Sequence, residues 1–176
     1  MSMPKLLAEG LLRKPLTETA PSPGNLGELG ARFEIAARRR LGRSLAIRQV
    51  DAGSCNACEL EINALANPYY DLERFGLRFV ASPRHADVLL VTGPVTLNMK
   101  EALERTWLAT PSPKWVVAAG ACAIGGGLFG GGYACARGVE AVVPVDLRIP
   151  GCPPTPTALL AALLTLMEGA RAGSAK

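Results

Sequence analysis

Short apolar runs alternate with amphipathic stretches of helical period along most of the chain. The continuous apolar runs Ala86–Thr92 and Trp115–Ala119 are typical of strands buried on both faces. Further strands are expected at residues 45–50, 78–81 and 141–145, and helices at residues 57–66, 97–108 and 155–167. Because strand and helix alternate throughout, the pattern predicts an α/β fold with a mostly parallel sheet.

The first 43 residues differ from the rest. Residues 1–30 contain four prolines and no sustained apolar period, so we expect an extended lead-in. Residues 26–41 have the spacing of an amphipathic helix with an arginine-rich flank, which suits contact with a membrane surface or a partner, or a solvated basic face. The predicted organisation is an N-terminal arm over 1–43, one α/β domain over 44–170 and a tail over 171–176.

Composition and charge narrow the class of protein. The 176 residues are 49% hydrophobic and 19% charged, which suits one domain with a full core. The net charge of +4 arises in residues 31–48, where six arginines accompany one glutamate, so we expect an interaction arm and no nucleic-acid partner. No apolar stretch reaches the roughly 18–20 residues of a membrane-spanning helix, and the N-terminus lacks a signal-peptide pattern. A soluble, intracellular protein is expected.

Four of the five cysteines follow predicted strands. Cys55 and Cys58 come after the strand at 45–50, Cys122 after that at 115–119, and Cys152 after that at 141–145. Cys135 lies apart, in a glycine-rich excursion. The carboxyl ends of parallel strands share one edge of the sheet, where ligands bind. Four thiols from distant parts of the chain are therefore expected to meet there.

Four convergent thiols predict a metal site rather than a disulfide scaffold, since the chain is large and lacks a signal peptide. Structural zinc usually takes two close Cys-x-x-Cys pairs, whereas this chain has one pair and two distant single cysteines. That pattern favours a [4Fe–4S] cluster. Zinc remains an alternative, as do a thioredoxin-like dithiol and inert cysteines. The predicted cluster ligands are Cys55, Cys58, Cys122 and Cys152.

Little else in the sequence suggests catalysis. His85 is the only histidine, so hydrolase chemistry is not expected. Glu61, three residues after Cys58 on a predicted helix, is expected to point toward the cluster and is a candidate for proton passage. A cluster protein without substrate-handling residues is expected to carry electrons.

Five motifs in a fixed order point to a family. They are Cys-Asn-Ala-Cys-Glu-Leu-Glu-Ile at 55–62, Ser-Pro-Arg-His-Ala-Asp-Val-Leu-Leu-Val-Thr-Gly at 82–93, Ala-Gly-Ala-Cys-Ala at 119–123, Val-Pro-Val-Asp at 143–146 and Ile-Pro-Gly-Cys-Pro-Pro-Thr at 149–155. Over residues 44–168 the chain closely resembles the small iron–sulfur subunit of membrane-bound [NiFe]-hydrogenases of the formate hydrogenlyase and energy-converting type. It is also similar to the 20-kDa subunit of respiratory complex I. The resemblance implies a flavodoxin-like fold with helices on both faces of the sheet, and one [4Fe–4S] cluster on the four cysteines.

The resemblance also implies a role and partners. The chain would be a non-autonomous electron-transfer subunit of an oxidoreductase complex, peripheral on the cytoplasmic face of the cell membrane. Its partners would be a large [NiFe]-hydrogenase-like or 49-kDa-like subunit, a ferredoxin-like Fe–S subunit and membrane-arm subunits. Neutralising Arg38, Arg39 and Arg40 is expected to loosen membrane attachment, because arginines near anionic lipids each contribute on the order of 1 kcal/mol.

Two details favour the hydrogenase branch over a complex I-type subunit that passes electrons to quinone. Cys55 and Cys58 are split by two residues, whereas complex I relatives have adjacent cysteines, and those relatives commonly have glutamine in place of His85. Ala57 and the glycine-rich stretch 125–135, with its extra Cys135, depart from the hydrogenase pattern. A zinc-stabilised binding module is the alternative from another class.

Overall fold

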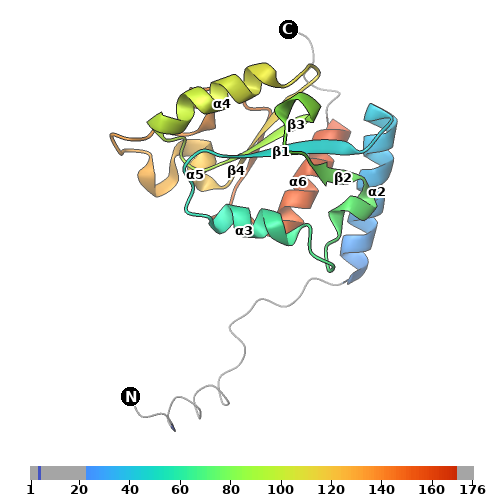
Figure 1. The fold of residues 1–176 in the computed structure, drawn as a ribbon. Coiled ribbons are helices and arrows are strands. Elements are labelled where there is room, and N and C mark those ends of the chain that lie inside the picture. The colour runs from blue at the N-terminus through green and yellow to red at the C-terminus, as the bar shows by residue number, and fades with distance from the viewer. Residues whose placement is uncertain (1–3, 5–22, 170–176) are drawn as a thin grey trace.

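The computed structural model describes Pro4 and residues 23–169, and contains a single five-stranded parallel sheet in that part of the chain (Figure 1). The strands are β1 (Leu45–Asp51), β2 (Leu77–Phe79), β3 (Val88–Thr92), β4 (Trp115–Ala119) and β5 (Leu147–Ile149). Their spatial order is β2-β1-β3-β4-β5, which is the flavodoxin-like doubly wound order. The predicted α/β fold with a parallel sheet is therefore confirmed. Most of the expected lead-in, and the tail at 171–176, lie outside the described residues.

Helices cover both faces of the sheet, as predicted. One face carries α2 (Pro23–Leu41), α3 (Ala57–Ala64) and α6 (Pro156–Gly169), whose buried side chains share one core with the sheet. The other face carries α4 (Leu97–Ala109) and α5 (Ala121–Gly125), with a second core. Four 3-10 helices complete the described elements: η1 (Leu72–Phe75), η2 (Pro83–His85), η3 (Gly127–Phe129) and η4 (Val139–Ala141).

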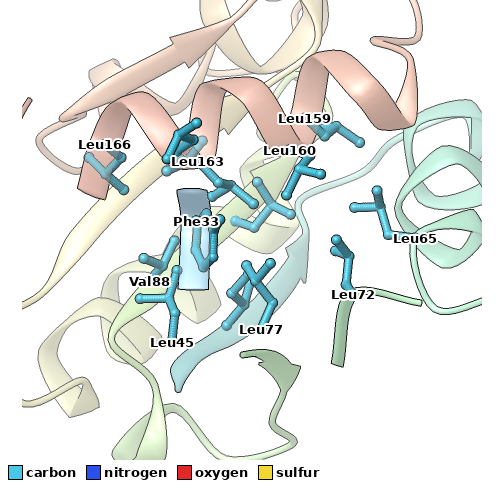
Figure 2. Packing of buried hydrophobic residues seen from close by; sticks show 14 of the residues in the cluster. Phe33, Leu45, Leu65, Leu72, Leu77, Val88, Leu159, Leu160, Leu163 and Leu166 are labelled. Carbon is cyan, nitrogen blue, oxygen red and sulfur yellow. The ribbon is translucent and has the colours of Figure 1, made fainter. Parts of the chain in front are cut away.

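Helix α2 contributes to the first core. Its Phe33 is fully buried and lies between the sheet residues Leu45 and Val88 and the α6 residue Leu163 (Figure 2). The helix begins at residue 23 instead of 26, with a proline as its first residue, a position that tolerates the missing N–H. The apolar face of this amphipathic helix is thus buried in the core of its own domain.

The arginines of α2 divide into two groups. Arg38 and Arg39 are exposed, and Arg38 pairs with Glu34 at 2.9 Å. Arg40 instead lies 4.4 Å from the centre of the Trp115 ring and donates a hydrogen bond of 3.2 Å to the Leu166 carbonyl at the end of α6. Neutralising all three arginines would therefore change internal packing as well as surface charge.

The prediction of a strand at 141–145 is wrong, because the fifth strand, β5, begins only at Leu147. Pro144 has no N–H to offer a neighbouring strand, and Val139–Ala141 forms the 3-10 helix η4. Val143 lies in a loop and is buried in the second core, which explains why an apolar residue stands at this position. Pairing with β4 begins only after Asp146, whose backbone N–H donates to the Val116 carbonyl at 2.9 Å. Strand β2 is also displaced, by one residue at its start, from the predicted 78–81.

Candidate metal centre

Three loops at the carboxyl ends of β1, β4 and β5 carry the four predicted ligands. Cys55 and Cys58 follow β1, Cys122 lies on the short helix α5 after β4, and Cys152 follows β5. Backbone hydrogen bonds of 2.8 Å, from Gly120 N–H to Ile149 O and from Ala121 N–H to Gly151 O, join the β4 and β5 loops. We call this side of the molecule, defined by the four cysteines, the thiol edge.

The loop after β1 is held by side-chain hydrogen bonds. Asp51 Oδ1 accepts bonds of 2.8 Å from the N–H groups of Gly53 and Ser54, and Ser54 Oγ accepts one of 3.1 Å from Asn56 N–H. A Cβ on Gly93, after β3, would lie 2.7 Å from Ser54 N, so only glycine lets the β3 end approach this loop. The loop is thereby fixed against the neighbouring strand.

Electrostatic interactions connect the four thiols. Burial raises the pKa of the Cys58 thiol to about 11. Negative charges nearby add to the rise, namely those of Glu59, Cys55, Cys122 and Cys152. Burial likewise raises the pKa of Cys122, with smaller contributions from Cys152, Cys55 and Cys135, while a backbone hydrogen bond with Leu128 opposes the rise. The fold therefore brings together the thiols that the sequence placed on separate loops.

Space beside two of the sulfurs is kept free of side chains. A Cβ on Gly120 would lie 2.7 Å from Cys58 Sγ, and one on Gly127 would lie 2.8 Å from Cys122 Sγ. Both glycines have positive φ, 91° and 52°. Only glycine at these two positions lets the backbone lie directly against the sulfurs, where backbone N–H groups can tune a bound cluster.

Four thiolates are a donor set that both zinc and a four-iron cluster accept. Among the described residues, no three His, Cys, Asp or Glu side chains converge closely enough to hold one metal ion. Four sulfurs on one zinc ion lie roughly 3.8 Å apart, because Zn–S bonds are about 2.3 Å long and tetrahedral. Each cysteine of a four-iron cluster binds a different iron, so its sulfurs are spread more widely. The residues present fit such a cluster.

Glu59, which the sequence pattern does not single out, is the carboxylate next to the Cys58 thiol. Its side chain is buried, with 6% of the residue exposed, and Ser54 Oγ donates to its Oε2 at 2.6 Å. Its Oε1 is buried and has no hydrogen-bond partner among the described residues. The sequence feature that could have indicated this carboxylate is Ser54, a hydrogen-bond donor that stands just before the Cys-x-x-Cys pair and five positions before Glu59.

The other singled-out residues are placed as follows. Glu61 is half-buried on α3, and its charge contributes to the raised pKa of Tyr70, after the desolvation of that phenol and the influence of Tyr69. Its expected proximity to the cluster stays a prediction. His85 is exposed at the amino end of β3, away from the thiol edge. Cys135 is half-buried and, contrary to its isolation in sequence, lies near enough to influence Cys122.

A protein-family model described as NADH ubiquinone oxidoreductase, 20 Kd subunit, matches residues 55–166, which contain all four cysteines of the thiol edge. The chain belongs to this family. Among relatives of this 20-kDa-family chain, formate hydrogenlyase subunit 7 of Escherichia coli (strain K12) is 45% identical over 140 residues, covering 80% of this chain and 55% of that protein. The chain thus spans about half the length of that relative.

Two further relatives cover more of their own length. The probable membrane-bound hydrogenase subunit mbhJ of Pyrococcus furiosus is 46% identical over 128 residues, covering 73% of this chain and 77% of that protein. A chain of the membrane-bound sulfane sulfur reductase, an archaeal respiratory membrane complex, has a TM-score of 0.67 and 35% identity, covering 82% of this chain and 77% of its own. In the described part of the 20-kDa-family chain, no helix has the length and apolar character needed to cross a bilayer.

Large apolar side chains stand exposed on the glycine-rich stretch of this 20-kDa-family chain. Leu128 is 95% exposed and Tyr133 is 99% exposed, and both follow Cys122 in the segment that returns to Cys135. Phe129 is half-exposed between them. Exposed apolar side chains gathered in one short segment make this stretch a candidate protein–protein contact surface.

Proposed function

We propose that this chain is an electron-transfer subunit that carries one [4Fe–4S] cluster at the thiol edge, next to the large catalytic subunit of a membrane-attached [NiFe]-hydrogenase-like complex. The observation that carries the proposal is the approach of four thiols from three loops to one edge of the sheet, within a chain of the 20-kDa family. Glycine backbone packs directly against two of these sulfurs. The ligands would be Cys55, Cys58, Cys122 and Cys152.

The cluster would supply one-electron transfer, and the chain would hold and tune it. Cys58 and Cys122 would bind from positions where burial raises the pKa of each thiol, so binding must release their protons. The backbone hydrogen bond of Leu128 with Cys122 would stabilise the bound thiolate. Glu61 is proposed for proton passage toward the large subunit.

The partners follow from the same reading. The exposed apolar residues near the thiol edge would face the large [NiFe]-hydrogenase-like subunit, and a ferredoxin-like Fe–S subunit would deliver or accept electrons. Membrane-arm subunits would hold the assembly at the cytoplasmic face of the cell membrane, with the chain itself peripheral. As a single cluster carrier without substrate-binding residues, it would act only within the oxidoreductase complex.

The names of two relatives favour the hydrogenase reading over transfer to quinone. The two at 45% and 46% are named for formate hydrogenlyase and a membrane-bound hydrogenase. A second candidate follows from the sulfane sulfur reductase, whose chain shares the fold at 35% identity. In that case the same electron path would serve reduction of sulfur compounds instead of hydrogen chemistry.

Hydrogen-dependent viologen reduction by the anaerobically purified complex tests the proposal. We expect activity in the unmodified complex and its loss in Cys152→Ser, because that variant lacks one thiolate ligand. Cys135→Ser is the matched control and should leave the activity unchanged. A reducible cluster without hydrogen-dependent activity would favour the sulfur or quinone reading. Zinc in place of iron and acid-labile sulfide would refute electron transfer altogether.

A further inference from the structure

Glu59 closes the loop that carries the first two predicted ligands. Ser54 Oγ donates a hydrogen bond of 2.6 Å to Glu59 Oε2 and accepts one of 3.1 Å from Asn56 N–H. Ser54 is itself fixed through its backbone N–H, which donates to Asp51 Oδ1 at 2.8 Å. The chain from residue 51 to residue 59 is therefore tied at both ends and in the middle by side chains that are not cysteines.

The carboxyl group of Glu59 is also unusually placed for a charge. The residue is 6% exposed, and its Oε1 is buried without a hydrogen-bond partner in the described part of the chain. Acidic side chains are rarely buried unless they are paired, because removal from water is costly. Among residues 23–169, the hydrogen bond found for the carboxylate comes from the Ser54 hydroxyl. Glu59 directly follows Cys58 on α3, so its buried carboxyl group lies next to the segment that carries this ligand.

We propose that Glu59 is a positioning residue that holds the Cys55–Cys58 loop and, through its buried negative charge, lowers the midpoint potential of the cluster. This inference rests on the proposed function, since it requires the cluster at the thiol edge. Reduction of the cluster adds one electron, delivered by a neighbouring iron–sulfur carrier, and no covalent bond is made or broken. A fixed negative charge beside the ligand sulfur raises the free energy of the more negative, reduced state.

The Ser54 hydroxyl has an opposite effect in this scheme. By donating a hydrogen bond to the carboxylate, it partly neutralises the charge that the cluster experiences. Removal of the carboxylate charge and removal of the hydroxyl should therefore move the potential in opposite directions. A purely structural role of the two residues would instead loosen the same loop in both variants and give no such opposition.

The test is a redox titration of the anaerobically purified complex, followed by the electron paramagnetic resonance signal of the reduced cluster. Glu59→Gln keeps an oxygen that can accept from Ser54 and removes the charge. We expect its midpoint potential to rise by an amount that changes the ratio of reduced to oxidised cluster about tenfold, which is about 59 mV for one electron. Ser54→Ala should lower the potential.

Glu73→Gln is the control for removal of a carboxylate elsewhere. Glu73 lines a pocket with Arg38 and Gly76 near the amino ends of β1 and β2, at the opposite end of the sheet, and its loss should leave the potential unchanged. An unchanged potential in Glu59→Gln, or a rise in Ser54→Ala, would overturn the inference. If Glu59→Gln assembles no cluster, the direction of the Ser54→Ala shift decides. Absence of a cluster signal in the unmodified complex would instead refute the proposed function.

Discussion

At the scale of single residues, the Cys58 thiol is set apart by its surroundings. Burial, and then the charges of Glu59 and the other thiols, raise its pKa from 9.0 to about 11. The reactive thiolate is therefore scarce at pH 8, at roughly one molecule in a thousand. In cluster-free protein we expect iodoacetamide to modify Cys58 far more slowly than the exposed Cys55 and Cys152 at pH 8, and faster as the pH approaches 11.

Mass spectrometry of the alkylated peptides measures these rates. The raised pKa in the folded state also means that this thiol stabilises the cluster-free fold below pH 9, and that the contribution is lost as the pH rises toward 11. The midpoint of urea unfolding should accordingly fall over that interval. Equal labelling of the three cysteines at pH 8 would contradict the assigned environment of Cys58.

Gly120 is the second residue whose environment gives a direct test. An alanine there would place its Cβ 2.7 Å from Cys58 Sγ and would adopt a positive φ of 91°. We expect Gly120→Ala to lose most of the cluster, measured as iron and acid-labile sulfide per chain. Gly125→Ala, at the end of the short helix α5 that Gly120 precedes, has nothing within 4 Å of the added Cβ and should retain the cluster. Normal cluster content in Gly120→Ala would show that the space beside Cys58 is not used.

At the scale of the elements, helix α2 is tied to the α/β core by Phe33. This side chain is fully buried against β1, β3 and α6 (Figure 2). Phe33→Ala should lower the free energy of unfolding by about 3–5 kcal/mol, because the cavity cannot close completely. Ile35→Ala on the same helix removes a side chain that is 67% exposed and should change stability by less than about 0.5 kcal/mol.

Urea unfolding of the two variants, followed by circular dichroism, measures the difference. Similar midpoints for Phe33→Ala and the unmodified chain would mean that α2 is a detachable arm. The same packing sharpens the membrane prediction, since Arg38 and Arg39 are exposed while Arg40 stacks on Trp115. Neutralising only Arg38 and Arg39 tests membrane attachment without disturbing that contact.

At the scale of the whole molecule, the thiol edge and the exposed apolar side chains lie in one region. Leu128 and Tyr133 are almost completely exposed, in the segment between Cys122 and Cys135. If this surface binds the large subunit, Leu128→Ser with Tyr133→Ser should weaken the association at least tenfold, as loss of central apolar contacts does. Co-purification at increasing dilution measures the effect, and Leu108→Ser, exposed at the end of α4, is the control.

The sequence by itself determined the fold class and the order of the elements. Apolar runs such as Ala86–Thr92 are typical of strands buried on both faces, and their alternation with helical periods predicts a mostly parallel sheet. Because each of the four cysteines comes after a strand, the same pattern also determined that they gather at one edge. The apolar pattern does not distinguish Val143 from a strand residue, because a loop residue that is buried against α4 and α5 is apolar as well.

Only the tertiary structure decided what surrounds the thiols. The close approach of Gly93 to Ser54 and of Gly120 to Cys58 brings the ends of β3 and β4 against the loop that follows β1. The same holds for α2, whose apolar face could have met a lipid, a partner or its own core. A one-dimensional pattern specifies which side of an element is apolar, whereas packing between distant segments decides what that side meets and which polar groups are left without water.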